Sequence, residues 1–74
     1  MMGDTAHDDA MWLLGFAAAM RGRVPAPMRR DRAGYASAIR TASQVVGDGA
    51  FNPLCVWDMQ AVARLLRSEM NDGR

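Results

Sequence analysis

A short internal repeat is the feature that most constrains how this chain folds. Segment 15–21 reads Gly, aromatic, three small residues, a long apolar residue and Arg, and the same pattern returns nineteen residues later in segment 34–40. Small residues at helical spacing allow two helix backbones to approach closely. We therefore expect two helices folded against each other as a hairpin. Gly15 and Gly34 should lie at the helix contact, and the two repeated aromatic residues should meet in the core.

The length of the chain limits its sources of stability. A protein of 74 residues forms one domain, 1–74, and buries only about 60–65% of its unfolded surface. Cys55 is the only cysteine, so no disulfide can close within the chain, and His7 is the only histidine. We therefore expect no metal site and no other cofactor, and stability must come from helix packing or oligomerisation. The single thiol and the acidic start predict a cytoplasmic protein.

Apolar periodicity predicts three helices, over about 8–21, 29–46 and 53–71. Asp4 or Thr5 would cap the first helix. Short loops between helices favour an antiparallel arrangement. The expected fold is therefore all-α, a small antiparallel three-helix bundle built on a helical hairpin packed through Gly and Ala.

The third helix has two alternative starts. Asn52 followed by Pro53 fits a cap residue and a proline at the first helical position, and we favour this start. In the alternative, segment 54–57 is extended and Asp58 is the cap. A helix-turn-helix interpretation of the last two helices is disfavoured, because their connection is longer and richer in Gly than a tight turn.

The first helix carries no polar side chain between residues 10 and 20. A helix that is apolar on all sides is expected to be buried on all sides, and two short neighbours cannot cover it completely. Two interpretations stay open. Either small Ala and Gly faces tolerate water, or a flank formed by Met11, Trp12 and Met20 packs against a second copy of the chain or a target protein.

Basic residues are concentrated in the middle third. All nine Lys or Arg residues are Arg, and residues 21–40 carry a net charge of +5 within a chain of net charge +1. Guanidinium groups bind phosphates and carboxylates bidentately. Three roles stay open: a solvated hairpin tip paired with Asp31 and the acids of the first helix, a contact with an acidic protein, or nucleic-acid binding. The arginine patch consists of Arg21, Arg23, Arg29, Arg30 and Arg32.

Catalysis has little support in this sequence. A nucleophile needs a nearby base, and the flanking apolar residues predict that Cys55 is a buried, inert thiol. His7 lies near the end of the chain. We therefore expect that the protein is not an enzyme. Trp57 is either a core residue or a surface anchor, since aromatic residues are enriched at binding surfaces.

The two Gly-aromatic segments resemble the ribosome modulation factor family, whose members carry a similar helical element twice with a basic linker between. The matching residues are Gly15-Phe16, Ala18 and Gly22-Arg23, then Gly34-Tyr35 and Ala38, and the resemblance covers residues 12–41. It implies a helical hairpin and binding to ribosomal RNA. The sequence departs from the family in using Phe at the first aromatic, in lacking Trp at the second, and in the helix expected after residue 52.

The favoured interpretation is a small protein-binding module of bacterial or phage origin. It would act as an inhibitor or adaptor by covering a surface of a larger host protein or complex, as phage inhibitors of host defence or transcription do. The alternative is an RNA- or ribosome-binding protein that uses the arginine patch on phosphates. The expected partner-binding residues are Arg23, Arg29, Arg30, Arg32, Trp12 and Trp57.

Overall fold

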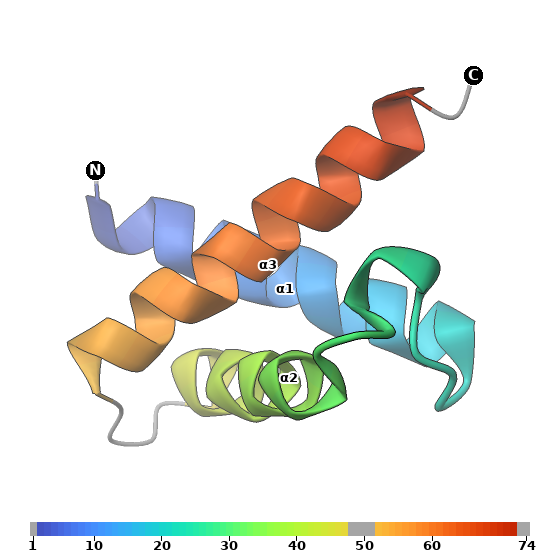
Figure 1. The fold of residues 1–74 in the computed structure, drawn as a ribbon. Helices are drawn as coiled ribbons and strands as arrows, with labels where there is room; N and C mark the ends of the chain where they lie inside the picture. Colours follow the sequence, from blue (N-terminus) through green and yellow to red (C-terminus); the bar gives the residue numbers. More distant parts are fainter. Residues whose placement is uncertain (1, 48–51, 73–74) are drawn as a thin grey trace.

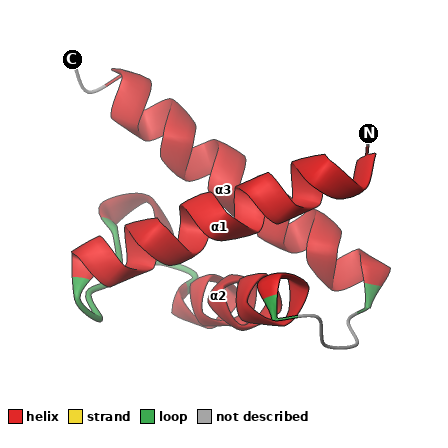
Figure 2. Ribbon diagram, turned by 180° about the vertical axis from the view of Figure 1, so that it is seen from behind, coloured by secondary structure: helices red, strands yellow, loops and turns green. Residues whose placement is uncertain are grey.

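Three α-helices pack against one another in the described part of the chain. The computed structural model describes residues 2–47 and 52–72, with side chains for residues 5–47 and 52–70. The elements are α1 (Met2–Met20), the short 3-10 helix η1 (Ala26–Met28), α2 (Arg32–Val46) and α3 (Pro53–Asp72). The expected all-α three-helix bundle is confirmed. In both views α1 and α3 cross obliquely, and α2 lies on one side of that crossing (Figures 1 and 2).

The helix α1 begins six residues earlier than the sequence analysis placed it. Asp4 and Thr5 therefore lie inside the helix, and the prediction that one of them caps it is wrong. The early start has a packing reason. Ala6 packs against the core, and it lies four residues before Ala10, which is fully buried. The inward stripe of α1 thus extends toward the N-terminus by one further turn.

The end of α1 is a left-handed turn. Arg21 has φ of 53° and Gly22 has φ of 84°. The Arg21 N–H donates to the carbonyl oxygens of both Ala17 and Ala18, at 3.2 Å each. Such a turn satisfies carbonyl groups that the last helical turn leaves free, and it reverses the chain. Glycine adopts this conformation without steric cost, whereas arginine adopts it at a steric cost.

The helix α2 begins at Arg32, three residues later than predicted, because η1 is followed by a turn at residues 29–30 and by the cap residue Asp31. Two prolines, Pro25 and Pro27, disfavour a continuous α-helix there. Asp31 then caps α2, and its carboxylate accepts a hydrogen bond from the Gly34 N–H at 3.0 Å. An Asp cap of this kind typically stabilises a helix by about 1 kcal/mol.

The helix α3 begins where the favoured interpretation placed it. The side-chain oxygen of Asn52 accepts a hydrogen bond from the Leu54 N–H at 2.9 Å, and the backbone carbonyl of Asn52 accepts from Val56. Pro53 is the first helical residue. The alternative start at Asp58 is wrong, since residues 54–57 are already helical. This cap and proline fix the point at which the chain enters its longest helix.

The core lies where the three helices meet. Its buried apolar residues are Ala10, Leu13, Met28, Tyr35, Ala38, Ala42, Val56, Met59, Ala63 and Leu66. On α3 the inward residues follow alternating spacings of three and four, which is the period of a helix face. The apolar residues Leu65 and Met70 of α3 are exposed instead. Four of the buried residues are alanines, so the helices do pack through small residues.

The glycines of the repeat do not make the expected helix contact. Gly15 is exposed, and a Cβ atom added there would meet nothing within 4 Å. A Cβ at Gly34 would overlap the Asp31 carboxylate that caps the same helix. The two copies also face different surroundings, since Ala38 is buried while its counterpart Ala19 is exposed. The repeat in sequence is therefore not a repeat in packing.

Candidate protein-binding surface

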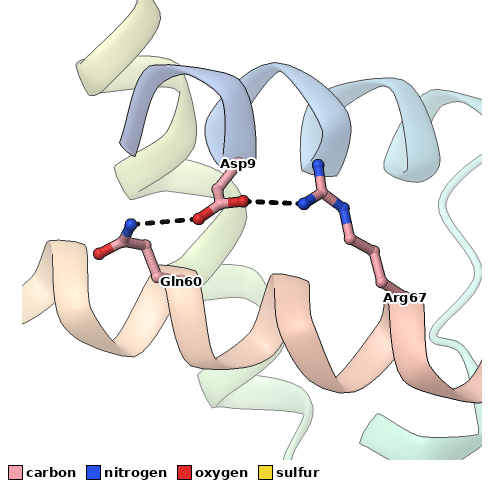
Figure 3. Close-up of polar contacts among 3 residues, drawn as sticks. All are labelled: Asp9, Gln60 and Arg67. Atoms are coloured by element: carbon pink, nitrogen blue, oxygen red, sulfur yellow. Dashed lines mark hydrogen bonds and ion pairs between the residues drawn. The ribbon is translucent and has the colours of Figure 1, made fainter. Parts of the chain in front are cut away.

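A polar cluster joins α1 and α3 at their crossing. Asp9 is 4% exposed, and its two carboxylate oxygens accept hydrogen bonds from different residues of α3 (Figure 3). Arg67 donates from Nη1 at 3.0 Å, and Gln60 donates from Nε2 at 3.1 Å. A buried carboxylate needs such partners, because an unpaired one carries a large desolvation penalty. The cluster therefore fixes how the two helices cross.

Trp12 belongs to the same crossing. The Arg67 guanidinium lies over the Trp12 ring, 5.0 Å from its centroid. Trp12 also stacks on Phe16, with ring centroids 5.3 Å apart and an interplanar angle of 24°. Trp12 is half-buried and packs against the core. The structure thus engages Trp12 in its own packing, although the sequence analysis counted it among the partner-binding residues.

Trp57 has a different environment from Trp12. Its side chain is 67% exposed, and Leu54, three residues earlier on the same face of α3, is 62% exposed. Trp57 lines a hollow of about 360 Å³ between the start of α3 and the N-terminal part of α1. We call this the Trp57 hollow, and its lining residues are Thr5, Trp57, Gln60, Ala61 and Arg64. Of the two roles left open for Trp57, the structure places it at the surface.

A second depression lies between the later part of α1 and the end of α3. Its volume is about 340 Å³, and its lining is almost wholly apolar. We call it the α1–α3 groove; its lining residues are Met11, Trp12, Gly15, Phe16, Ala19 and Met70. Met11 and Met70 are more than half exposed at its edges. Of the flank expected to face a partner, Met11 is exposed, whereas Trp12 and Met20 are half-buried.

The arginine patch lies on the connection between α1 and α2 and on the first residue of α2. All five of its side chains are exposed, and none forms an ion pair with a side chain that the structure describes. The expected acidic partners are used elsewhere. Asp31 caps α2, and Asp9 pairs with Arg67 of α3. Neither Asp31 nor Asp9 therefore forms an ion pair with the patch, whereas its arginines are exposed to solvent, as the hairpin-tip interpretation expects.

The described residues offer no assembled metal centre. Among them, no group of three or more His, Cys, Asp or Glu side chains could hold a metal ion. His7 is exposed, and Cys55 is a free, half-buried thiol, so its predicted burial is only partial. None of the described helices has the length and apolar character that a membrane span requires.

The chain matches no protein-family model, no curated protein and no solved structure. The resemblance to the ribosome modulation factor family therefore stays a prediction.

The sequence analysis missed the Asp9 cluster. A signal was present, because Gln60 and Arg67 are spaced by seven residues around Ala63 and so share one face of α3. On α1, Asp9 lies four residues before Leu13, which is fully buried. Both patterns place polar side chains on an inward face.

Proposed function

We propose that this chain is a non-enzymatic, protein-binding module that uses the exposed face at the start of α3. The observation that carries the proposal is the exposure of Trp57 beside a hollow. Tryptophan is the residue type most enriched among side chains that dominate binding energy at interfaces. A large indole left two-thirds exposed contributes little to the protein's own core, whereas covering it with a partner would contribute about 2 kcal/mol or more.

The surroundings of Trp57 suit a protein partner. Leu54, Trp57 and Ala61 follow the spacing of one helix face, so a partner groove can take them together. Arg64 lines the same hollow and is exposed. An aromatic anchor with an adjacent guanidinium is the composition typical of an interface core. The partner surface should therefore offer an apolar pocket with a carboxylate at its edge.

The arginine patch adds a long-range contribution to this binding. Its exposed guanidinium groups, without described ion-pair partners, attract an acidic surface and speed encounter. A small cytoplasmic protein with these features acts as an inhibitor or adaptor, covering a functional surface of a larger bacterial host protein. Arg23, Arg29, Arg30 and Arg32 then serve as orienting contacts, while Trp57 supplies most of the affinity.

The test is capture from the lysate of a G+C-rich bacterium with the tagged chain, read by mass spectrometry with and without nuclease. Wild-type protein should retain a discrete set of proteins after nuclease treatment. Trp57→Ala should lose that set, whereas Leu65→Ala, which truncates another exposed apolar residue of α3 outside the hollow, should keep it. Equal capture by both variants would mean that Trp57 is not part of the interface.

The second candidate is an RNA- or ribosome-binding protein, and the unpaired arginine patch is the observation that favours it. Backbone phosphate contacts make affinity fall steeply with salt. In this case ribosomal proteins would be captured and would disappear after nuclease treatment. Arg29→Glu combined with Arg30→Glu would abolish capture, while Trp57→Ala would leave it unchanged.

A further inference from the structure

The outward face of α1 carries a regular stripe that no described part of the chain covers. Asp8, Met11, Gly15 and Ala18 are all exposed, and their spacings are three, four and three residues. The next residue in this series is Gly22, in the turn after α1. Alternating spacings of three and four form the seam along which two helices pair in a coiled coil. We call these four side-chain positions of α1 the α1 seam.

We propose that the α1 seam pairs with the same seam of a second copy of the chain, in antiparallel orientation, with Gly15 at the two-fold axis. A symmetric dimer requires a self-complementary surface, because residue i of one copy meets residue j of the other, and residue j meets residue i. The pairing makes use of the apolar α1–α3 groove, which Gly15 helps to line. It does not involve Trp57, the anchor of the proposed function, which belongs to neither the seam nor the groove, although it shares Arg23 with the arginine patch.

Size is complementary along this antiparallel pair. Met11 lies four residues before Gly15 and Ala19 lies four residues after it, so each Met11 would meet Ala19 of the second copy, the exposed neighbour of the seam residue Ala18. Met11 is long and 52% exposed, whereas Ala19 is small and exposed. At the centre, the space around Gly15 is empty, so two backbones can approach to about 8 Å, the lower limit for packed helices.

Charge is complementary at the two ends of the pair. Asp8 lies seven residues before Gly15, about 10 Å along α1. Arg21 lies six residues after Gly15 and directly follows the last helical residue. Antiparallel pairing brings each Asp8 to the end of the second copy's α1, near Arg21 and the turn that leads to Arg23. All three charged side chains are exposed, and none forms an ion pair with a described side chain. A parallel pairing would instead place Asp8 against Asp8.

The interface is short, about four helical turns, so the dimer should be reversible and dependent on concentration. Analytical ultracentrifugation of the purified chain, from low micromolar to millimolar concentration, should show a monomer–dimer equilibrium. Gly15→Leu puts two isobutyl groups at the axis and should weaken association at least about tenfold. Ala36→Leu, on the exposed face of α2, is the matched control and should leave association unchanged. Circular dichroism checks that both variants keep their helices.

A charge exchange tests the orientation and does not depend on a bulky substitution. Asp8→Arg should weaken self-association, and so should Arg21→Asp combined with Arg23→Asp, because each variant places like charges in contact. Mixing the two variants restores both contacts and should yield a heterodimer by native mass spectrometry. A wild-type chain that stays monomeric over the whole range, or variants that fail to combine when mixed, would overturn the proposal. Neither result bears on capture through Trp57.

Discussion

The carboxylate of Asp9, on α1, accepts a hydrogen bond from the guanidinium of Arg67, on α3, across a sequence separation of 58 residues. The same guanidinium covers the Trp12 ring, and Trp12 stacks on Phe16. One arginine thus connects the buried acid of the helix crossing to the aromatic pair that continues along α1. The crossing in turn separates the Trp57 hollow from the α1–α3 groove.

Asp9→Ala should lower the free energy of unfolding by about 1–3 kcal/mol, because the variant leaves Gln60 and Arg67 without their shared acceptor. Arg67 is 40% exposed along its side chain, so water compensates part of the loss. Urea denaturation of the single variants and of Asp9→Ala with Arg67→Ala measures the coupling between the two residues. Strictly additive losses would mean that the ion pair contributes nothing.

Two glycines, one inside α1 and one in the turn that follows it, should respond to alanine in opposite directions. Gly15→Ala should raise the free energy of unfolding by up to about 1 kcal/mol, because Gly15 is helical, exposed and free of neighbours. Gly22→Ala should lower it by about 1 kcal/mol, because φ is 84° there. Thermal melts in dilute protein, below any self-association, provide the comparison. A loss of stability in Gly15→Ala would mean that Gly15 does lie at a helix contact, as the repeat predicts.

Tyr35→Phe should preserve or raise stability. The Tyr35 hydroxyl is buried and has no hydrogen-bond partner among the described residues. Removing an unpaired buried hydroxyl while keeping the ring should raise the free energy of unfolding by up to about 2 kcal/mol. Denaturant titration of both proteins at neutral pH measures this. A clear loss of stability would show that the hydroxyl has a partner.

Tyr35 also predicts how stability depends on pH. Burial raises the pKa of Tyr35 above its ordinary value of 10.0, so the folded protein holds its phenolic proton at a pH where the unfolded chain releases it. Stability is therefore full below pH 10 and falls as pH rises beyond it. The chain has no other Tyr and no Lys, so few other groups titrate in this range. Tyr35→Phe should flatten the alkaline limb of the stability profile.

Local signals in the sequence were sufficient for some elements of the fold. The Asn52-Pro53 pair predicted the start of α3 because a cap and an N-terminal proline act within one turn. The start of α1 has no comparable signal, since the residues before Asp8 continue the helix through packing of Ala6. Likewise, the repeat could not reveal that Gly15, in its first copy, faces outward. The way in which the helices cross decides which face of α1 is covered, and the repeat does not specify that crossing.

The candidate surface was predictable to a similar extent. The arginine patch was evident from charge alone, and its exposure follows from its place in a connection. The residue type of Trp57 did not decide between a core and a surface position. Its place on the helix does, because it lies one residue after the inward Val56 and two before the inward Met59, and a side chain at that position points outward. The Asp9 cluster needed the crossing of two helices far apart in sequence, which no local pattern specifies.

The most direct test of the binding role follows the emission of Trp57 itself. Trp12→Phe keeps an aromatic ring beside Phe16 and leaves Trp57 as the only tryptophan. Free protein should emit at the long wavelength of a solvated indole, and titration with the captured partner should shift the emission to shorter wavelength until saturation. A matched Trp57→Phe variant, with Trp12 retained, should show no such shift. If the partner saturates the Trp12→Phe variant while its emission stays that of a solvated indole, Trp57 is not the binding anchor.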